Sequence, residues 1–165
     1  MLHKVTIAGL TMDPTSNTPI VILKTEDGDE AIPIWIGILE ATAIASALQG
    51  VKFDRPMTHD LFRNFANKLN VRLEHVEVCD IQNNTYYARI HYTVNDKTED
   101  LDARPSDAIA LALRFEVPIF VDSRVIQKSS TGESSPDAMD TSEEGKKWAD
   151  YLEKLSAEDF GKYKV

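Results

Sequence analysis

The sequence predicts an α+β protein in which pairs of strands alternate with alanine-rich helices. Segments of alternating apolar and polar residues meet at hairpin-type turns, at Asp27-Gly28, Asn83-Asn84 and Asn95-Asp96. Two alanine-rich segments, 39–49 and 105–115, follow such strand pairs and have the length of helices. We therefore expect a mixed or antiparallel sheet with helices packed on it.

The order of elements follows from the same patterns. Strands are expected at 4–10, 19–25, 30–36, 71–79, 85–94, 98–103 and 117–121. Glu74-His75 interrupts the alternation of the fourth of these strands, which predicts a β-bulge.

A third helix is predicted between Thr58, its expected N-cap, and Asn70. Its apolar residues form one stripe at helical spacing, made of Leu61, Phe62, Phe65, Ala66 and Leu69. The opposite face is polar and is expected to face solvent, and it consists of Arg63, Asn64, Asn67 and Lys68.

An internal repeat links the two halves of the chain. The segment Ala43–Leu48 (AIASAL) matches Ala108–Leu113 (AIALAL), and each follows a strand, an acidic turn and a return strand. This pattern favours a duplicated β-β-α unit. The alternative is that two unrelated helices are both rich in alanine.

The chain of 165 residues predicts one domain at residues 1–125, since it can bury a sizeable core. Residues 126–140 are rich in serine and lack apolar periodicity, which predicts a flexible loop or linker. A helical tail is predicted at 141–165, where Thr141 and Glu144 have capping-box spacing. Its apolar face carries Trp148, Tyr151, Leu152 and Leu155.

Composition points to a soluble cytoplasmic protein. The start of the chain has no signal-peptide pattern, and the single Cys79 permits no intramolecular disulfide. The most apolar stretch, 31–51, contains Glu40 and is broken by Pro33 and Gly37, so no membrane span is predicted. The net charge of −9 and the lack of a basic run argue against a broad basic nucleic-acid interface.

Two short segments concentrate the residues that could perform chemistry. The first, 55–60, contains Arg55, Thr58, His59 and Asp60 at a predicted helix start. A guanidinium that binds anions, an imidazole that titrates near neutral pH and a carboxylate would converge there. The alternative is structural, with Thr58 as cap and Asp60 complementing the helix dipole, but His59 is not needed for either role.

The second segment repeats the pattern as Arg104, Pro105, Ser106 and Asp107 at the start of the other alanine-rich helix. Capping explains Ser106 and Asp107 but not a second Arg-Pro pair. Glu40, the only ionisable side chain between 31 and 51, should be paired, hydrogen-bonded, bound to a metal or at an exposed edge.

Three motifs in order resemble the bifunctional nuclease domain family. They are Ile32–Gly37 (IPIWIG) with Glu40-Ala41, Arg55–Leu61 (RPMTHDL), and Arg104–Ala112 (RPSDAIALA) with Val117-Pro118-Ile119. The resemblance covers about residues 3–125. It implies a compact α+β domain that forms a homo-oligomer, a dimer or a trimer, and a nuclease activity on DNA and RNA. Plant members with this activity carry an added C-terminal module that has no clear counterpart here.

The site chemistry itself is inferred from the residues. In a phosphodiesterase, His59 would be the general base or acid, with Asp60 and Asp107 as its catalytic partners. Glu40, Asp60 and Asp107 would hold Mg²⁺ or Mn²⁺. Arg55 and Arg104, together with Thr58 and Ser106, would bind the phosphate of a nucleic acid.

Two other functions fit the same residues. One is a non-catalytic domain that binds a small anion or nucleotide at the helix starts, which suits the acidic surface better. The other is a structural oligomer, in which the two arginines form ion pairs with Glu40 and Asp107.

Overall fold

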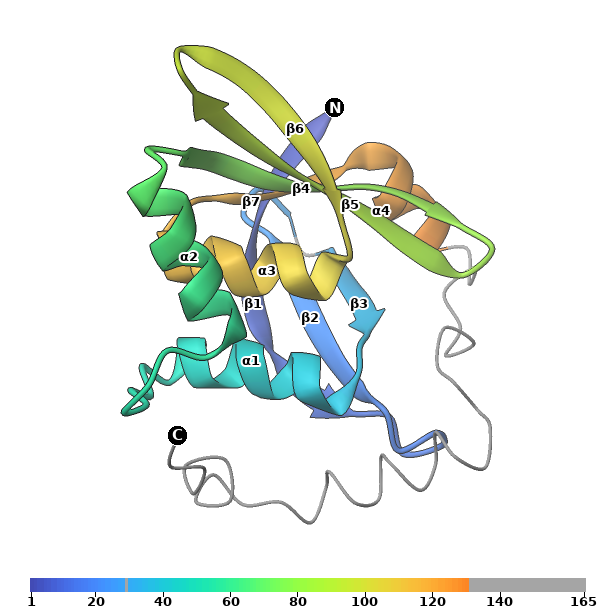
Figure 1. Cartoon of the computed structure of the whole chain (residues 1–165). Helices are drawn as coiled ribbons and strands as arrows, with labels where there is room; N and C mark the ends of the chain where they lie inside the picture. Colours follow the sequence, from blue (N-terminus) through green and yellow to red (C-terminus); the bar gives the residue numbers. More distant parts are fainter. Residues whose placement is uncertain (29, 131–165) are drawn as a thin grey trace.

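The computed structural model describes residues 1–28 and 30–130, and it confirms the α+β class (Figure 1). Seven strands form one mixed sheet, and four helices accompany it. In chain order the elements are β1 (Leu2–Met12), β2 (Pro19–Thr25), β3 (Ala31–Trp35), α1 (Ile38–Leu48), α2 (Thr58–Lys68), β4 (Arg72–Gln82), β5 (Thr85–Val94), β6 (Lys97–Ala103), α3 (Pro105–Phe115), β7 (Ile119–Asp122) and α4 (Ser123–Ser130).

The sheet has the order β3-β2-β1-β7-β4-β5-β6, so its two halves mirror each other about β7. Each half is an antiparallel meander of three strands, and a helix follows its outermost strand. The short β7 joins the halves, running antiparallel to β1 and parallel to β4. This arrangement is what a duplicated unit would produce, while the common origin of the halves stays a prediction.

The predicted turns and bulge explain how the second half folds. Asn83 and Asn84 have φ of 48° and 62°, and Asn95 and Asp96 have φ of 49° and 60°. Asparagine and aspartate tolerate this left-handed region, and two such residues in succession suit the turn of a tight hairpin. The register of β4 against β5 shifts next to His75, which confirms the bulge.

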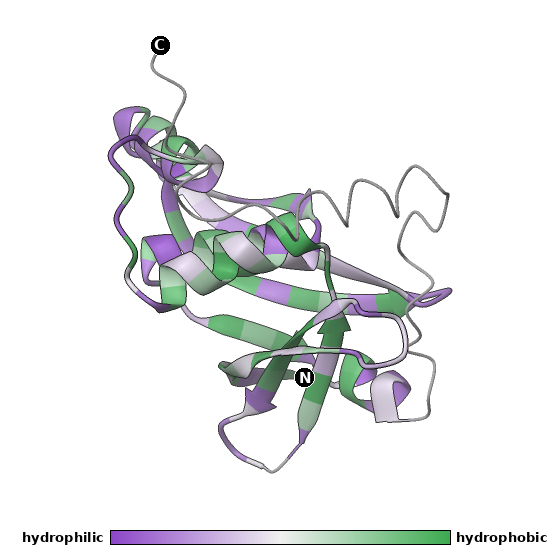
Figure 2. Cartoon of the chain, turned by 90° about the horizontal axis from the view of Figure 1, so that it is seen from below, coloured by the Kyte–Doolittle hydropathy of each residue, from purple (hydrophilic) through white to green (hydrophobic). Residues whose placement is uncertain are grey.

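Helix α3 lies at the centre of the core. Its residues from Pro105 to Ala112 are buried except for Asp107, and the helix packs against α1, α2, β4 and β5. Small side chains let these neighbours approach closely, and Ile109 and Ile44 are fully enclosed. Figure 2 shows the apolar stretches along the strands and central helices, with hydrophilic stretches mainly at turns and loops.

Residues 126–130 differ from the prediction, because they belong to α4 (residues 123–130) rather than to the start of a linker. Val125 and Ile126 are buried in the same core as α3. Lys128 fastens the helix by donating hydrogen bonds to Asp80 (2.9 Å) and to the carbonyl of Ile81 (2.8 Å). With only two apolar anchors, this helix leaves little periodicity in the sequence. The predicted helical tail lies outside the described residues.

Helix α2 differs from the prediction on its apolar side. The four large residues of the predicted stripe face solvent, with exposures of 60% at Leu61, 42% at Phe62, 62% at Phe65 and 53% at Leu69. Ala66 is the one buried residue of the helix, and the half-buried Arg63 donates a hydrogen bond to the carbonyl of Arg114. Asn64, Asn67 and Lys68 are exposed, as predicted, so both the large apolar side chains and most of the polar face of α2 are left uncovered.

None of the helices in the described ranges has both the length and the hydropathy required to cross a membrane.

The Asp80–Lys128 contact predicts how stability depends on pH. Hydrogen bonds from Gln82, Lys128 and the Ile81 amide lower the pKa of Asp80 from 3.8 to about 2. A carboxyl whose pKa is lower in the folded state stabilises the fold above its unfolded pKa, and this contribution is lost as the pH falls toward 2. We therefore expect Asp80→Asn to reduce the free energy of unfolding at pH 7, with the difference from wild type narrowing below about pH 4.

Urea unfolding followed by circular dichroism between pH 7 and pH 3 measures this. The control is Asp102→Asn, which removes an exposed carboxylate that makes no ion pair with the described residues. A difference that stays constant over this pH range would contradict the assignment.

Candidate functional site

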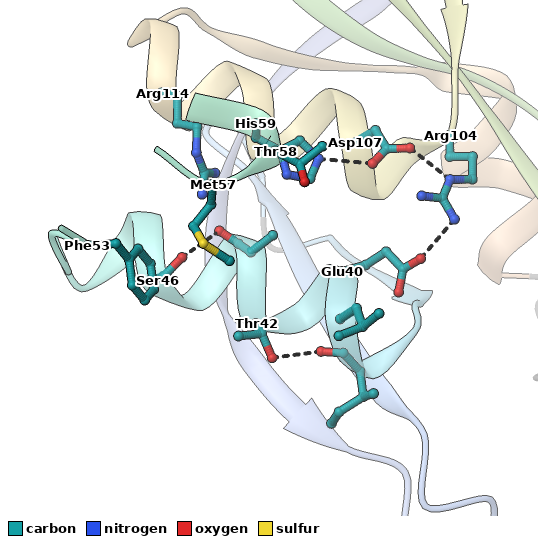
Figure 3. Close-up of a pocket in the computed structure, with 13 residues that line it drawn as sticks. Glu40, Thr42, Ser46, Phe53, Met57, Thr58, His59, Arg104, Asp107 and Arg114 are labelled. Carbon is teal, nitrogen blue, oxygen red and sulfur yellow. Dashed lines mark hydrogen bonds and ion pairs between the residues drawn. The ribbon is translucent and has the colours of Figure 1, made fainter. Parts of the chain in front are cut away.

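A pocket of about 420 Å³ lies where α1, the loop before α2 and the start of α3 meet (Figure 3). We call it the His59 pocket. Its polar lining is formed mainly by Glu40, Thr58, His59, Arg104, Asp107 and Arg114. Its apolar lining comes from Ile38, Leu39, Ala43, Phe53 and Met57.

Three helix starts supply the carboxylates predicted for the site. Glu40, Asp60 and Asp107 are each the third residue of α1, α2 and α3. A negative charge is favourable in this first turn, because the N-terminus of a helix carries partial positive charge.

The N-cap of α2 is Met57, so the expectation that Thr58 caps this helix was wrong. Asp60 performs the capping, since its Oδ2 accepts a hydrogen bond from the Met57 amide at 3.1 Å. This makes Thr58 the first helical residue and His59 the second, so both line the pocket.

A continuous chain of hydrogen bonds runs along the pocket wall. Arg104 Nη1 donates to Glu40 Oε1 at 2.8 Å, and Arg104 Nε donates to Asp107 Oδ2 at 2.7 Å. The other oxygen of Asp107, Oδ1, lies 3.0 Å from Nε2 of His59. Figure 3 shows the four side chains in this order, drawn from three helix starts.

The protonation of this chain follows from its geometry. Burial acts to raise the pKa of Asp107, but hydrogen bonds from Arg104 and His59 outweigh it, so the pKa lies below its ordinary value of 3.8. An ionised carboxylate only accepts hydrogen bonds, so Nε2 of His59 must carry the proton. In the neutral ring the lone pair is then on Nδ1, where it can accept a proton.

Asp60 is held away from this chain. Its Oδ1 accepts a hydrogen bond from Nε of Arg114 at 2.8 Å, and the Arg114 side chain is only 7% exposed. Burial again acts to raise the pKa of Asp60, and the hydrogen bonds from Arg114 and the Met57 amide lower it. The structure thus separates two carboxylates that looked equivalent in sequence.

The remaining predicted residues are dispersed. Ser106 is buried, at 6% exposure, and does not line the His59 pocket. Arg55 is exposed and lines a second, adjoining pocket. Arg114, which the sequence analysis did not single out, lines both pockets. Its one signal is a lone cation in the last turn of the helix, directly after the apolar run 108–113.

The predicted carboxylate triad does not fit a metal ion in this arrangement. In the described part of the chain, no three or more His, Cys, Asp or Glu side chains are grouped closely enough to hold one. Glu40 and Asp107 share the guanidinium of Arg104, and Asp60 is bound to Arg114. Since arginines occupy these oxygens, we derive no step through a metal.

Comparison with known proteins identifies the family. The sequence model of the bifunctional nuclease domain family matches residues 21–134, a range that includes the residues of both pockets. The chain belongs to the bifunctional nuclease domain family. The resemblance noted in the sequence motifs is thereby confirmed.

Relatives of this bifunctional nuclease domain chain fall into two groups. An uncharacterised protein of Mycobacterium tuberculosis is 37% identical over 96% of this chain and 98% of its own length. Bifunctional nuclease 1 of Oryza sativa subsp. indica is 28% identical over 64% of this chain. Bifunctional nuclease 2 of Arabidopsis thaliana is 30% identical over 61%. The aligned regions cover only 33% and 32% of these two plant proteins.

The position of Arg104 predicts the titration of Asp107. Replacing Arg104 with glutamine removes the main influence that lowers the pKa of Asp107, whereas burial still acts to raise it. We expect the pKa of Asp107 to be higher in Arg104→Gln than in the wild type, with the hydrogen bond from His59 as the remaining influence that lowers it.

Titration of the Asp107 carboxyl carbon by ¹³C NMR measures this. Arg89→Gln is the matched control, because Arg89 forms a similar ion pair with Asp100 (2.7 Å) on the sheet. An Asp107 titration that is the same in Arg104→Gln and wild type would refute the role given to Arg104.

Proposed function

We propose that this protein is a nuclease that hydrolyses phosphodiester bonds of DNA, RNA or both at the His59 pocket. The observation that supports this most directly is the His59–Asp107 hydrogen bond of 3.0 Å at the wall of a pocket large enough for a nucleotide unit. Membership of the family and the names of the plant relatives supply the reaction class.

Proton transfer is the step that His59 is suited to perform. Nδ1 of His59 would take a proton from the attacking water as its oxygen bonds to phosphorus. The bond from phosphorus to the leaving oxygen then breaks, and the imidazolium returns the proton to that oxygen. Asp107 fixes the tautomer and stabilises the imidazolium, and Arg104 in turn keeps Asp107 ionised and oriented. Arg104 is therefore a positioning residue.

The apolar part of the pocket suits the non-charged part of a nucleotide. Leu39, Phe53 and Met57 line the pocket, and their surfaces can cover a base or a sugar. Water excluded by these side chains would strengthen the hydrogen bonds along the pocket wall.

A non-catalytic domain that binds a small anion or nucleotide is the second candidate. One observation favours it: the second, adjoining pocket is lined by Lys52, Arg55 and Arg63, which can hold an anion without any proton transfer.

The cytoplasm remains our proposal for the location. Cys79 is a free thiol, its pKa is raised by burial, and it donates a weak hydrogen bond to the carbonyl of Tyr87. An unreactive thiol of this kind is compatible with a reducing compartment.

We also propose that the protein is a homo-oligomer and that the exposed apolar face of α2 is its contact surface. We define this face as Leu61, Phe62, Phe65 and Leu69, and its exposed area is roughly 400 Å². A standard interface buries about 800 Å² per partner, of which somewhat more than half is apolar. Two α2 faces in contact would supply nearly all of that apolar share, so a second copy of this chain is the occupant we favour.

The nuclease hypothesis predicts the effect of removing either member of the histidine–carboxylate pair. We expect His59→Ala and Asp107→Asn to lower kcat by about 10²–10⁴-fold on single-stranded DNA or RNA, because the proton acceptor or its orienting group is lost. Purified protein would be assayed with Mg²⁺, with Mn²⁺ and with EDTA, which also tests the predicted metal dependence.

The matched control is His91→Ala. His91 forms a comparable pair with Glu77 (3.2 Å) in the sheet and stacks on His75, outside both pockets. Equal activity in all three variants would indicate contamination or a different site. An absence of activity in the wild type under every condition would favour the small-anion candidate.

The contact surface on α2 predicts the effect of a charge at its centre. We expect the wild-type protein to have the mass of two or three chains in light scattering coupled to gel filtration. Phe65→Glu should have the mass of one chain, because burying a carboxylate in an apolar interface is costly. The control is Asn67→Glu, which adds the same charge to an exposed position on the opposite side of α2. A monomeric wild type, or a Phe65→Glu variant that stays oligomeric, would contradict the proposal.

A further inference from the structure

The seven arginines of this protein fall into two classes by their partners. Five form ion pairs with carboxylates at 2.7–2.9 Å, namely Arg72, Arg89, Arg104, Arg114 and Arg124. The other two are Arg55 and Arg63, which make no ion pair with any described residue. In a chain of net charge −9 that contains more carboxylates than cations, an arginine that forms no ion pair is the exception. The charge of Arg63 does help to lower the pKa of Asp60.

Both unpaired arginines line the same cavity. It has a volume of about 550 Å³, and Lys52, which also lacks an ion pair within the described ranges, lines it with them. We call this cavity the arginine pocket. Its carboxylates are Asp54, Asp60 and Glu116, and Asp60 is neutralised by Arg114. Three cations therefore face two unpaired carboxylates, so this cavity is locally positive on an acidic protein.

The arginine pocket adjoins the His59 pocket. The two cavities share Ser46, Phe53 and Arg114 in their linings. The side chain of Arg114 is nearly buried, and its hydrogen bonds to Asp60 and to the Ala110 carbonyl hold it in place. A chain molecule with a reacting group beside His59 would thus place its neighbouring units beside Lys52, Arg55 and Arg63.

We propose that the arginine pocket binds the phosphates of a single nucleic-acid strand next to the phosphodiester at His59. This inference rests on the proposed nuclease function, and it explains how a protein with a net negative catalytic wall would retain a polyanion. Arg104, with two carboxylate partners, has no remaining charge to offer a phosphate, whereas Arg55 and Arg63 do. A guanidinium group can donate two parallel hydrogen bonds to the oxygens of one phosphate. The release of counterions from the strand adds to its affinity for the protein.

The test is the binding of a fluorescein-labelled single-stranded oligodeoxynucleotide, followed by anisotropy. His59→Ala with EDTA serves as the host protein, so that strand cleavage does not interfere. Adding Lys52→Gln and Arg55→Gln to this host should raise Kd about tenfold or more. It should also lower the slope of log Kd against log salt concentration by about 1.4, since each lost contact to a single strand contributes about 0.7.

The matched control adds Arg72→Gln and Lys97→Gln to the same host. These residues are exposed and lie outside both pockets, so the control loses the same total charge. We expect its Kd to stay within about twofold of the host and its salt slope to be unchanged. Equal losses in the two double variants would show a non-specific charge effect and overturn the proposal.

Cleavage kinetics separate this inference from the proposed function. With His59 restored, Lys52→Gln/Arg55→Gln should raise KM and leave kcat nearly unchanged, because the pocket binds the strand away from the reacting atoms. If no protein cleaves but the binding difference persists, the nuclease proposal fails and the pocket assignment stands. If the wild type cleaves and the two substitutions change neither Kd nor KM, the assignment of the arginine pocket fails while the nuclease proposal stands. A host that binds no oligonucleotide also overturns it.

Discussion

One guanidinium holds the candidate site together. Arg104 directly precedes α3, and its side chain reaches Asp107 in the first turn of that helix and Glu40 in the first turn of α1. Two helix starts are thereby fixed to each other, and Asp107 is left with one free oxygen aimed at His59 of α2. Without Arg104, two carboxylates at neighbouring helix starts would repel each other. The orientation of His59, and with it any proton transfer in the pocket, depends on this shared cation.

The sheet explains why those helix starts meet. The two meanders mirror each other about β7, so β3 and β6 lie at opposite edges of the sheet, yet the helices that follow them cross over the same face. Alanine-rich sequences make α1 and α3 thin enough to pack directly on each other. The hydrogen-bonded chain crosses their contact, with Glu40 on one side and Arg104 and Asp107 on the other (Figure 3). The two similar halves of the sequence thus form two similar strand–helix units, and a single site lies between their helices.

Much of this frame could be predicted from local patterns, and the exceptions have physical causes. The bounds predicted for β2, β5 and α3 agree with the structure, because turns and an alternating or alanine-rich pattern define them locally. α4 was missed, since two buried residues in eight leave no periodicity. The apolar stripe of α2 was found, but of its residues only Ala66 is buried and the large side chains are exposed. Periodicity shows that a helix has an apolar side, and only the packing of α2 on α3 shows which side faces the core.

The two Arg-Pro motifs show most clearly where sequence reasoning ends. In the second motif arginine is the N-cap and proline the first helical residue, so Arg104 lies three residues before Asp107 and can fold onto it. In the first motif Met57 is the N-cap, so Arg55 lies five residues before Asp60, and Arg114 from α3 takes that carboxylate instead. A shift of two residues therefore converts one motif into a structural clamp and leaves the other with a free cation. The same dipeptide thus orients Asp107 at one pocket and leaves Arg55 without an ion pair at the next, where its charge can offset the acidity of the chain toward a polyanion.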